Sequence, residues 1–327
     1  MSKKQTKQEK AHKLSELISY YEVCNKAEGK TQRTINWYSD NLHQFRAYVL
    51  NRHYSENINS IDTTLIREYI LYLMAKHRFE THPYNSPTNE LLSSSTVHGH
   101  VRTLRAFSNW LLKEKLTNIN FTAGIKPPKI VRKVISTLSE EEIAQVLSTF
   151  NPSSVSDMRN KVMFMLLLDT GLRIGELINL KLDDVNIEEG LMKVMGKGKK
   201  ERMVPIGNKA QKVLHSYLFR FRPKPAYSGI NNAFLSVFGT PITENSVELV
   251  FARLARRSGV KRLHAHLCRH TFATMFLLNG GDIFTLQQIL GHSTLEMVRN
   301  YVTLASNQVA MRHHKYSPLD RLNSHKE

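Results

Sequence analysis

The stretch over residues 266–301 constrains the fold more than any other part of the sequence, because it alternates apolar helical segments with strong breaks. It reads HLCRHTFATMFLLNGGDIFTLQQILGHSTLEMVRNY. The first segment is apolar on most sides, which predicts a largely buried helix. Residues 279–282 (NGGD) end that helix and cap a second one, which Gly291 ends in turn. Residues 293–296 (STLE) have the spacing of a capping box, so a third helix should begin there.

Four polar side chains interrupt this apolar stretch: His266, Arg269, His292 and Tyr301. The first two lie three residues apart and so share one face of a helix. An arginine fork binds phosphate through two hydrogen bonds, and an imidazole can donate to phosphate oxygens or accept a proton. A tyrosine hydroxyl, with a pKa of about 10, attacks only when a neighbour accepts its proton and positive charge stabilises the phenolate. The set suggests covalent attack on a phosphodiester, although backbone-bonded core histidines and a packed tyrosine are the alternative.

A second motif, TGLRIGELINL, lies upstream at residues 170–180. Gly171 permits the tight turn that ends one helix and presents Arg173 at the start of the next. Glu176 lies one turn further on, where it can hydrogen-bond Arg173 and hold the guanidinium in a fixed plane. An exposed ion pair without function would look the same locally.

A β-hairpin is predicted between the two motifs. Residues 191–195 and 202–206 are short apolar segments around the turn GKGKKE, which is rich in glycine and lysine. Lys197 stands between two glycines that allow close approach of the backbone. Lys199 and Lys200 remain alternatives to Lys197, because the register of the turn is uncertain by a residue or two. A further strand is predicted at residues 234–238.

These segments together resemble the tyrosine recombinase (phage integrase) family. TGLRIGELINL is similar to the first conserved box of that family, and HLCRHTFAT, followed by LGH and then Tyr301, is similar to the second. The boxes are in the family's order and about 95 residues apart. The resemblance covers about residues 12–316. It departs from the family pattern at Cys268, where an aliphatic residue is usual and a buried thiol should serve as a small hydrophobe.

The resemblance implies both a fold and a set of catalytic roles. The fold would be mainly α with a small β-hairpin or sheet (α+β), a four-helix core-binding domain preceding the catalytic domain. Two arginines would grip the scissile phosphate, the tyrosine would attack it, a histidine would accept the tyrosine proton, and the hairpin lysine would protonate the leaving 5′-hydroxyl. The residues implied in catalysis are Arg173, Lys197, His266, Arg269, His292 and Tyr301, with Glu176 supporting Arg173.

The histidines of this half could also suggest a metal site. However, no cysteine or carboxylate lies at ligand spacing from them, and the family uses no metal. We therefore expect no metal and no other cofactor.

The first half of the chain shows a helical pattern throughout. Residues 1–10 are a basic, polar segment that we expect to be disordered. Over residues 11–116, apolar stripes predict four helices, of which the second begins near Thr31 and the fourth at residues 93–95. Four helices of this length form a small bundle. By resemblance, this bundle is the SAM-like core-binding domain that holds one face of the recombination site.

A basic segment follows, with Pro127-Pro128 at its centre. Two prolines stiffen a chain and exclude a helix, so residues 117–134 are predicted to be an interdomain linker. The catalytic domain would then occupy residues 135–316 and a tail residues 317–327. The side chains expected to contact DNA are His100, Arg102 and Arg105 on the fourth helix, Lys129 and Arg132 in the linker, and Lys199 and Lys200 in the turn.

Charge and cysteine content agree with this interpretation. Lys and Arg number 46 and Asp and Glu 28, a formal net charge of +18, which favours a polyanionic partner such as double-stranded DNA. Two widely separated cysteines indicate neither a zinc ribbon nor a disulfide framework, and suggest the cytoplasm. The longest apolar run is too short to span a bilayer, so no membrane association is expected.

Taken together with these features, the family resemblance implies a site-specific DNA recombinase that works through a 3′-phosphotyrosine. Strand exchange between two duplexes implies a homotetramer. The integrase or transposase of a mobile element is the preferred role, and an Xer-type resolvase of chromosome or plasmid dimers is the alternative. Two other classes remain open: a type IB topoisomerase-like nicking and closing enzyme, and a DNA-binding regulator without catalysis.

Overall fold

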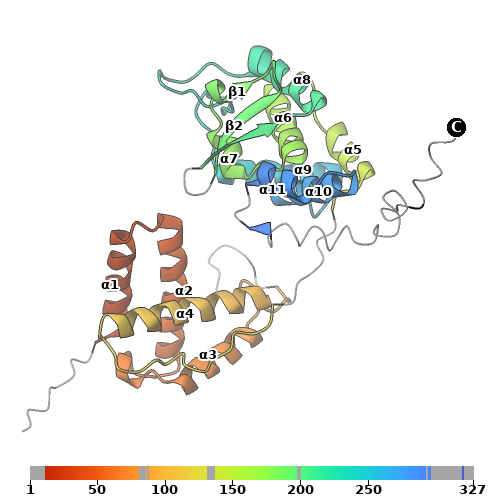
Figure 1. Cartoon of the computed structure of the whole chain (residues 1–327). Helices are drawn as coiled ribbons and strands as arrows, with labels where there is room; N and C mark the ends of the chain where they lie inside the picture. The colour runs from red at the N-terminus through yellow and green to blue at the C-terminus, as the bar shows by residue number, and fades with distance from the viewer. Residues whose placement is uncertain are drawn as a thin grey trace, which may run out of the picture. The chain divides into compact units, whose positions relative to one another are not determined.

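A computed structural model describes residues 12–80, 86, 88–130, 137–196, 200–291, 294–295 and 319. The chain divides into two compact units, Met1–Lys133 and Val134–Glu327 (Figure 1). Within the described ranges, the units are mainly helical, and the second also holds a small sheet, as predicted. No helix among the described residues is long and apolar enough to cross a membrane.

Four α-helices form the described part of the first unit, and polar caps begin three of them. The helices are α1 (Leu14–Ala27), α2 (Gln32–Asn51), α3 (Thr63–Ala75) and α4 (Ser94–Lys113), with a short 3-10 turn at Ile58–Ser60. The side chains of Thr31, Asp62 and Ser93 accept hydrogen bonds from the backbone N–H groups of the first turns of α2, α3 and α4. The predicted starts at Thr31 and residues 93–95 are therefore confirmed.

The core of the first unit includes part of the predicted linker. Phe45 and Phe107 are fully buried between the helices, and the later residues Phe121 and Ile125 pack into the same core. The prediction that a linker begins at residue 117 is therefore wrong for residues 117–125. Burying Phe121 and Ile125 removes apolar surface from water, which is favourable enough to fold this segment back onto α4.

His100 belongs to this core as well, so its prediction as a DNA contact is wrong. It is only 4% exposed, and its Nδ1 lies 3.3 Å from the Tyr69 hydroxyl. Burial, and then the charge of Lys76, lower the pKa of His100 to about 4. The ring is therefore neutral at neutral pH, and it faces the inside of the bundle.

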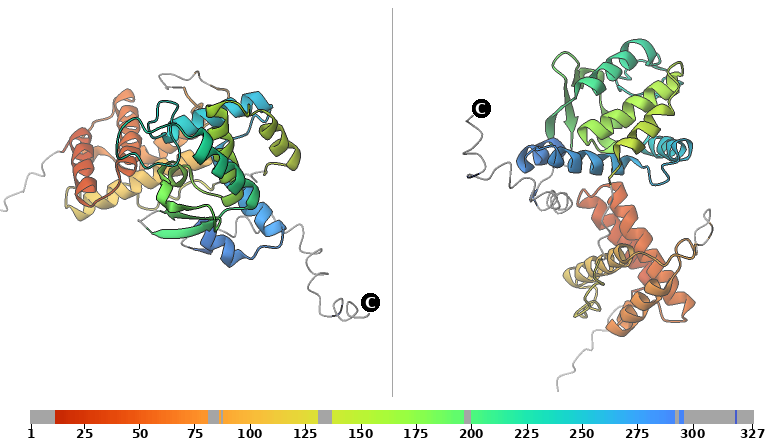
Figure 2. Two further views of the ribbon diagram at one scale, coloured as in Figure 1. Left: turned by 90° about the horizontal axis from the view of Figure 1, so that it is seen from above. Right: turned by 90° about the vertical axis from the view of Figure 1, so that its right-hand side faces the viewer.

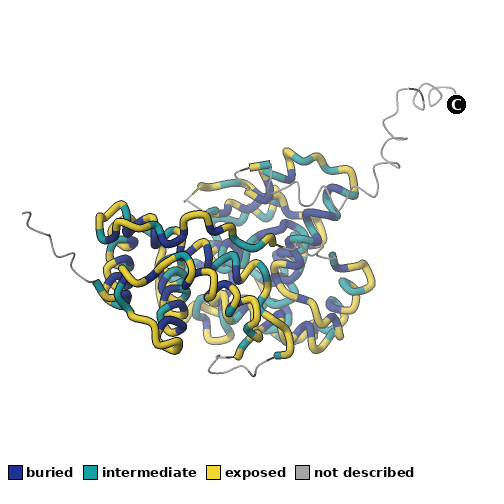
Figure 3. The backbone as a smooth tube through the Cα atoms, turned by 90° about the horizontal axis from the view of Figure 1, so that it is seen from below, coloured by how far each residue is buried: buried dark blue, intermediate teal, exposed yellow. Residues whose placement is uncertain are grey.

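The second unit consists of helices packed around α6 and a three-stranded sheet (Figure 2). Its helices are α5 (Glu140–Ser148), α6 (Val155–Thr170), α7 (Ile174–Asn179), α8 (Asn208–Ser216), α9 (Glu244–Ser258), α10 (Ala265–Leu278) and α11 (Ile283–Leu290), with a 3-10 turn at Leu182–Asp184 and a π-helical turn at Tyr217–Phe221. Figure 3 shows the buried residues as dark blue segments along the backbone, alternating with exposed ones.

The sheet contains the predicted hairpin. Its strands are β1 (Val185–Asn186), β2 (Leu191–Met195) and β3 (Glu201–Pro205), antiparallel and in that order. Met195 pairs with Glu201, and the Gly196 N–H donates to the Lys200 carbonyl 2.8 Å away, so residues 196–200 connect the strands. The strand predicted at residues 234–238 is wrong, because Leu235 makes only an isolated bridge to Pro241.

Two tight turns bring distant segments of the second unit together. Gly171 ends α6 in the left-handed region with φ 64°, and Gly291 ends α11 with φ 63°. Asp282 caps α11, as predicted, by accepting from the N–H groups of Phe284 and Thr285. Helix α10 packs along α6, and α11 packs against both α10 and β3. The start of α7, the end of α11 and the hairpin therefore meet.

Candidate active site

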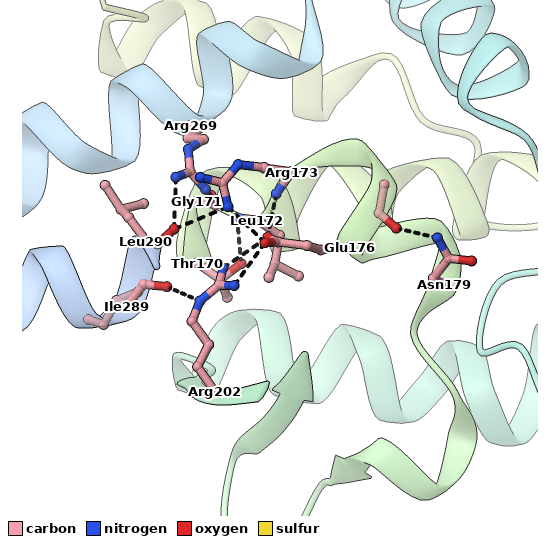
Figure 4. A network of polar contacts seen from close by, with 11 residues as sticks. Thr170, Gly171, Leu172, Arg173, Glu176, Asn179, Arg202, Arg269, Ile289 and Leu290 are labelled. Atoms are coloured by element: carbon pink, nitrogen blue, oxygen red, sulfur yellow. Dashed lines mark hydrogen bonds and ion pairs between the residues drawn. The ribbon is translucent and has the colours of Figure 1, made fainter. Parts of the chain in front are cut away.

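Two arginines that are far apart in the sequence converge on one backbone carbonyl. Arg173 stands at the N-cap of α7, and Arg269 lies in the second turn of α10. The Leu290 carbonyl accepts from Arg269 Nη2 at 2.9 Å and from Arg173 Nη1 at 3.4 Å (Figure 4). The end of α11 thus holds two positive charges next to each other.

The two arginines differ in exposure. The Arg173 side chain is 36% exposed, so its guanidinium can reach a ligand in solution. Arg269 is only 2% exposed, and its Nη1 also donates to the Gly171 carbonyl. Arg269 thereby connects α10 to the turn that presents Arg173, and its charge lies behind the more exposed guanidinium.

Gly171 is required in that turn. Its φ of 64° suits glycine, and a Cβ at this position would lie 2.5 Å from Phe272 Cδ1 and 2.7 Å from Leu290 Cδ2. The absence of a side chain therefore lets α6, α10 and α11 approach closely. This approach brings the Gly171 carbonyl to Arg269.

Glu176 hydrogen-bonds Arg173, as the spacing of the two residues predicted, and it also binds a third arginine. Its carboxylate accepts from the Arg173 backbone N–H and from Arg173 Nη1, both at 2.9 Å. It also accepts from both Nη atoms of Arg202, at 2.8 and 2.9 Å. Burial by itself raises the pKa of Glu176, but the hydrogen bonds and charges of the two arginines outweigh it, so the pKa is lowered. Glu176 is therefore a charged, buried carboxylate.

Arg202 is the member of this network that the sequence analysis missed. It lies on β3, donates through Nε to the Ile289 carbonyl at 2.7 Å, and has a side chain that is only 12% exposed. The sequence contains a signal for it. Alternate residues of a strand share one face, and Val204, two residues after Arg202, is buried. An arginine on the inner face of a strand needs a buried acceptor, which Glu176 supplies.

His266 lies beside the arginines in the first turn of α10, where it is exposed. Partial burial, then the positive charges of Arg269, His264 and Arg173, lower the pKa of His266. The His270 ring meets it edge to face, with 4.6 Å between the ring centroids. His266 is therefore neutral at neutral pH and can accept a proton.

Several predicted residues lie outside the described part of the chain. These are Lys197, His292 and Tyr301 of the catalytic set, and Lys199 and Arg132 of the expected DNA contacts. The described residues that precede two of them in the chain, Gly196 and Gly291, lie close to Arg202. A Cβ on Gly196 would be 3.4 Å from Arg202 Nη1, and one on Gly291 would be 3.0 Å from the same atom. In the chain, Gly196 precedes Lys197, and Gly291 precedes His292.

The remaining expected DNA contacts are exposed. Lys200 and Lys129 are both at the surface. On α4, the Arg102 guanidinium lies over the Trp37 ring, 4.8 Å from its centroid, and Arg105 donates to the Ile125 carbonyl. Cys268 is fully buried, and burial raises the pKa of its thiol, so it acts as an apolar core residue.

This geometry suits a phosphodiester ligand. A partly exposed guanidinium, a second guanidinium behind it and a neutral imidazole provide positive charge and a proton acceptor in one place. The buried carboxylate keeps the outer arginine in one orientation, which reduces the cost of ordering it around a ligand.

Comparison with known proteins supports this description. Residues 136–308 match the model of the phage integrase family, and residues 16–126 match that of the phage integrase SAM-like domain. Tyrosine recombinase XerD of Staphylococcus saprophyticus is 29% identical over 301 residues, which cover 91% of this chain and 97% of the relative.

Two solved structures share the fold. One is the Tn1549 transposon integrase in complex with transposon right end DNA, with a TM-score of 0.71 and 19% identity over 94% of this chain and 99% of that one. The other is the XerH site-specific recombinase bound to palindromic difH substrate, with a TM-score of 0.69 and 21% identity over 92% and 84%.

Proposed function

We propose, because this chain belongs to the phage integrase family of tyrosine recombinases, that its candidate active site cuts and rejoins double-stranded DNA at a specific site. The observation that carries the proposal is the convergence of Arg173 and Arg269 on the Leu290 carbonyl, next to His266. Such a pair suits the charge that develops on a phosphate during attack.

The proposed reaction assigns one role to each side chain. The Tyr301 oxygen attacks the scissile phosphorus and transfers its proton to His266, while the bond from phosphorus to the 5′-oxygen breaks. Lys197 protonates the departing 5′-oxygen. Arg173 and Arg269 stabilise the non-bridging oxygens, Arg173 from the exposed side. His292 is a further hydrogen-bond donor to the phosphate.

The product is a 3′-phosphotyrosine and a free 5′-hydroxyl. Attack by a 5′-hydroxyl of the partner duplex reverses the chemistry and releases Tyr301. Because the phosphodiester bond energy is kept in the covalent intermediate, neither ATP nor a metal ion has to drive rejoining. Exchange between two duplexes involves two sites, each bound by two protomers, so we propose a homotetramer.

We propose the integrase or transposase of a mobile element as the biological role. The long connection from Ala75 to Ser94 supports it, and so does the structural similarity to the Tn1549 transposon integrase. An Xer-type resolvase is the second candidate, because the sequence relatives named XerD match along nearly their whole length. We also propose a cytoplasmic location, in line with a DNA substrate and two free cysteines.

Covalent trapping tests the proposed function and identifies the site. The chain is expressed in cells that contain the host DNA. Covalent protein–DNA complexes are then denatured and purified, and the attached DNA ends are sequenced. We expect ends with one common sequence joined through a 3′-phosphate. Tyr301→Phe loses one hydroxyl and should still bind that sequence while forming no adduct. An adduct at normal yield in this variant would place the nucleophile elsewhere.

A two-site assay then separates recombination from nicking and closing. Plasmids that carry two copies of the trapped sequence should exchange segments. Relaxation of a one-site plasmid without any exchange between two sites would favour a topoisomerase-like enzyme. Binding without an adduct in the wild type would favour a non-catalytic regulator.

A further inference from the structure

We propose, on the basis of the function proposed above, that Arg202 is a positioning residue for DNA cleavage. It holds Glu176 and the end of α11 in the arrangement that presents Arg173 and Arg269 to the scissile phosphate. The residue itself lies on β3, between the two conserved boxes and outside both of them, and it is not one of the residues inferred to act in catalysis.

The side chain of Arg202 bridges two segments that are far apart in the sequence. Its two Nη atoms donate to the two oxygens of Glu176, and its Nε donates to the Ile289 carbonyl (Figure 4). Three donors of one rigid, planar group are thus used at once. The Arg202 guanidinium therefore helps to fix the distance between the start of α7 and the end of α11.

Both contacts connect Arg202 to the proposed catalytic arginines, one through Glu176 and the other through the end of α11. Glu176, held by Arg202, accepts from the backbone and side chain of Arg173. Ile289, the other acceptor, precedes Leu290, whose carbonyl accepts from both Arg173 and Arg269. A displacement of the Arg202 guanidinium would consequently reach Arg173 through Glu176, and would reach Arg269 through Ile289 and Leu290.

Two glycines leave room for this arrangement. A Cβ on Gly291 would lie 3.0 Å from Arg202 Nη1 and 3.1 Å from its Cδ, and a Cβ on Gly196 would lie 3.4 Å from Nη1. A contact of 3.0 Å is tight for a Cβ, so a side chain at Gly291 would push against the Arg202 guanidinium. The backbone therefore encloses the guanidinium from the hairpin side and from the end of α11.

The buried ion pair of Arg202 with Glu176 could stabilise the fold without any role in cleavage. Arg222 provides a control for that alternative. Arg222 lies in the same unit and is half-buried like Arg202. It donates through Nε and Nη2 to the carbonyls of Asn232 and Ala233. Arg222 thus makes a similar number of hydrogen bonds without contacting Glu176 or either proposed catalytic arginine.

The test uses the full-length chain and a nicked duplex that carries the sequence found by covalent trapping. Arg202→Lys keeps a positive charge beside Glu176, but a single ammonium cannot reproduce a planar fork. We expect its site binding to stay close to that of the wild type and its single-turnover cleavage to fall about 100-fold, as for a misplaced reacting group. Arg222→Lys should change neither site binding nor cleavage. The two variants should unfold at temperatures similar to each other.

A second substrate distinguishes positioning from a loss of structure. When a methyl group replaces one non-bridging oxygen, the scissile linkage is neutral and its transition state needs less positive charge. If Arg202 acts through Arg173 and Arg269, the deficit of Arg202→Lys should shrink to about 10-fold or less on this methylphosphonate. Arg202→Gln, which keeps hydrogen-bonding groups without the charge, should show the same pattern.

Three results would overturn the role of Arg202. The first is a cleavage deficit of Arg202→Lys that is equal on the normal and the methylphosphonate substrate. The second is a loss of site binding in Arg202→Lys that is as large as its loss of cleavage. The third is cleavage by Arg202→Lys as fast as that by Arg222→Lys. A wild-type chain that forms no adduct with any DNA would contradict the proposed function and this role with it.

Discussion

Glu176 shows how single residues keep two positive charges together in this site. Its carboxylate is buried, and it stays ionised because Arg173 and Arg202 donate to both of its oxygens. Each arginine in turn loses a buried acceptor if Glu176 is removed. Residues that depend on each other in this way act as a unit, so the effects of substitutions among them should not add.

His266 should titrate below the ordinary histidine value in the free protein. Partial burial, and then the charges of Arg269, His264 and Arg173, disfavour the protonated ring, so its pKa is lower than about 6.5. The neutral ring, which can accept the tyrosine proton, therefore persists at a lower pH than in a fully solvated histidine. An NMR titration of the imidazole signals, assigned with His266→Gln, should give a midpoint below pH 6.5.

His264→Gln provides a matched variant for this titration. It removes a neighbour whose positive charge opposes protonation of His266, so the midpoint should rise. Because burial is the largest cause of the shift, the midpoint should still remain below that of a fully solvated histidine. A wild-type midpoint above pH 6.5 would disprove the lowered pKa.

The position of a residue on the inner or outer face of a helix decides whether its burial could be predicted from the sequence. His100 and Arg102 lie two positions apart on α4, so they cannot share a face, and only Arg102 is exposed. The spacing of the buried residues Val97, Val101 and Leu104 already indicated the inner face. Arg202 was harder to find, because an arginine in a strand points inward only if a distant residue such as Glu176 receives it.

At the scale of elements, local signals predicted the starts of helices better than the short strands. Capping side chains such as Thr31 and Ser93 act on N–H groups two or three residues away, so the sequence contains the whole interaction. Strand β1 has two residues and depends entirely on pairing with β2. The strand predicted at 234–238 does not form, because an apolar run becomes a strand only where a partner strand lies beside it.

Gly171→Ala should destabilise the second unit, because the turn that it forms tolerates no side chain. The left-handed backbone costs about 1–2 kcal/mol for a residue other than glycine. The added methyl would also lie 2.5 Å from Phe272 and 2.7 Å from Leu290. Such overpacking costs a further 1–3 kcal/mol or so. Urea unfolding followed by far-UV circular dichroism should therefore show a lower free energy of unfolding.

Gly259→Ala is the matched control for that substitution. Gly259 ends α9 with φ 77°, and nothing lies within 4 Å of its Cβ position, so only the backbone cost of about 1–2 kcal/mol applies. Both tryptophans, Trp37 and Trp110, lie in the first unit, so their fluorescence should report its unfolding and remain unchanged in both variants. Equal losses in the two variants would show that the contacts at Gly171 are unimportant.

At the scale of the whole molecule, the order of the two motifs was sufficient to predict the family and the fold class. The positions of the two cores could not be predicted to the residue, because they depend on contacts such as that of Phe121 with the first bundle. The convergence of Arg173, Arg202 and Arg269 likewise depends on how α6, α10, α11 and the hairpin pack. The sequence predicted two of these three arginines, and it did so through resemblance rather than through packing.

Salt dependence of DNA binding is the expected property of the whole chain. Each phosphate that a lysine or arginine neutralises releases counterions, so the slope of log K against log salt is about −0.9 per contact. The chain has a net charge of +18, and Arg102, Arg105 and Lys129 are exposed on its first unit. The full-length chain should therefore show a steeper slope than a chain beginning at Val134.

Fluorescence anisotropy with a labelled duplex of the trapped sequence, repeated over a series of salt concentrations, measures this slope. Arg102→Gln in the full-length chain should make it shallower by about 0.9 if the guanidinium over Trp37 contacts one phosphate. Lys193→Gln is the matched control, because Lys193 pairs with Asp184 in the second unit and is not among the expected DNA contacts. Identical slopes for the full-length and truncated chains would exclude the first unit from the DNA interface, since a unit that neutralises phosphates must contribute to counterion release.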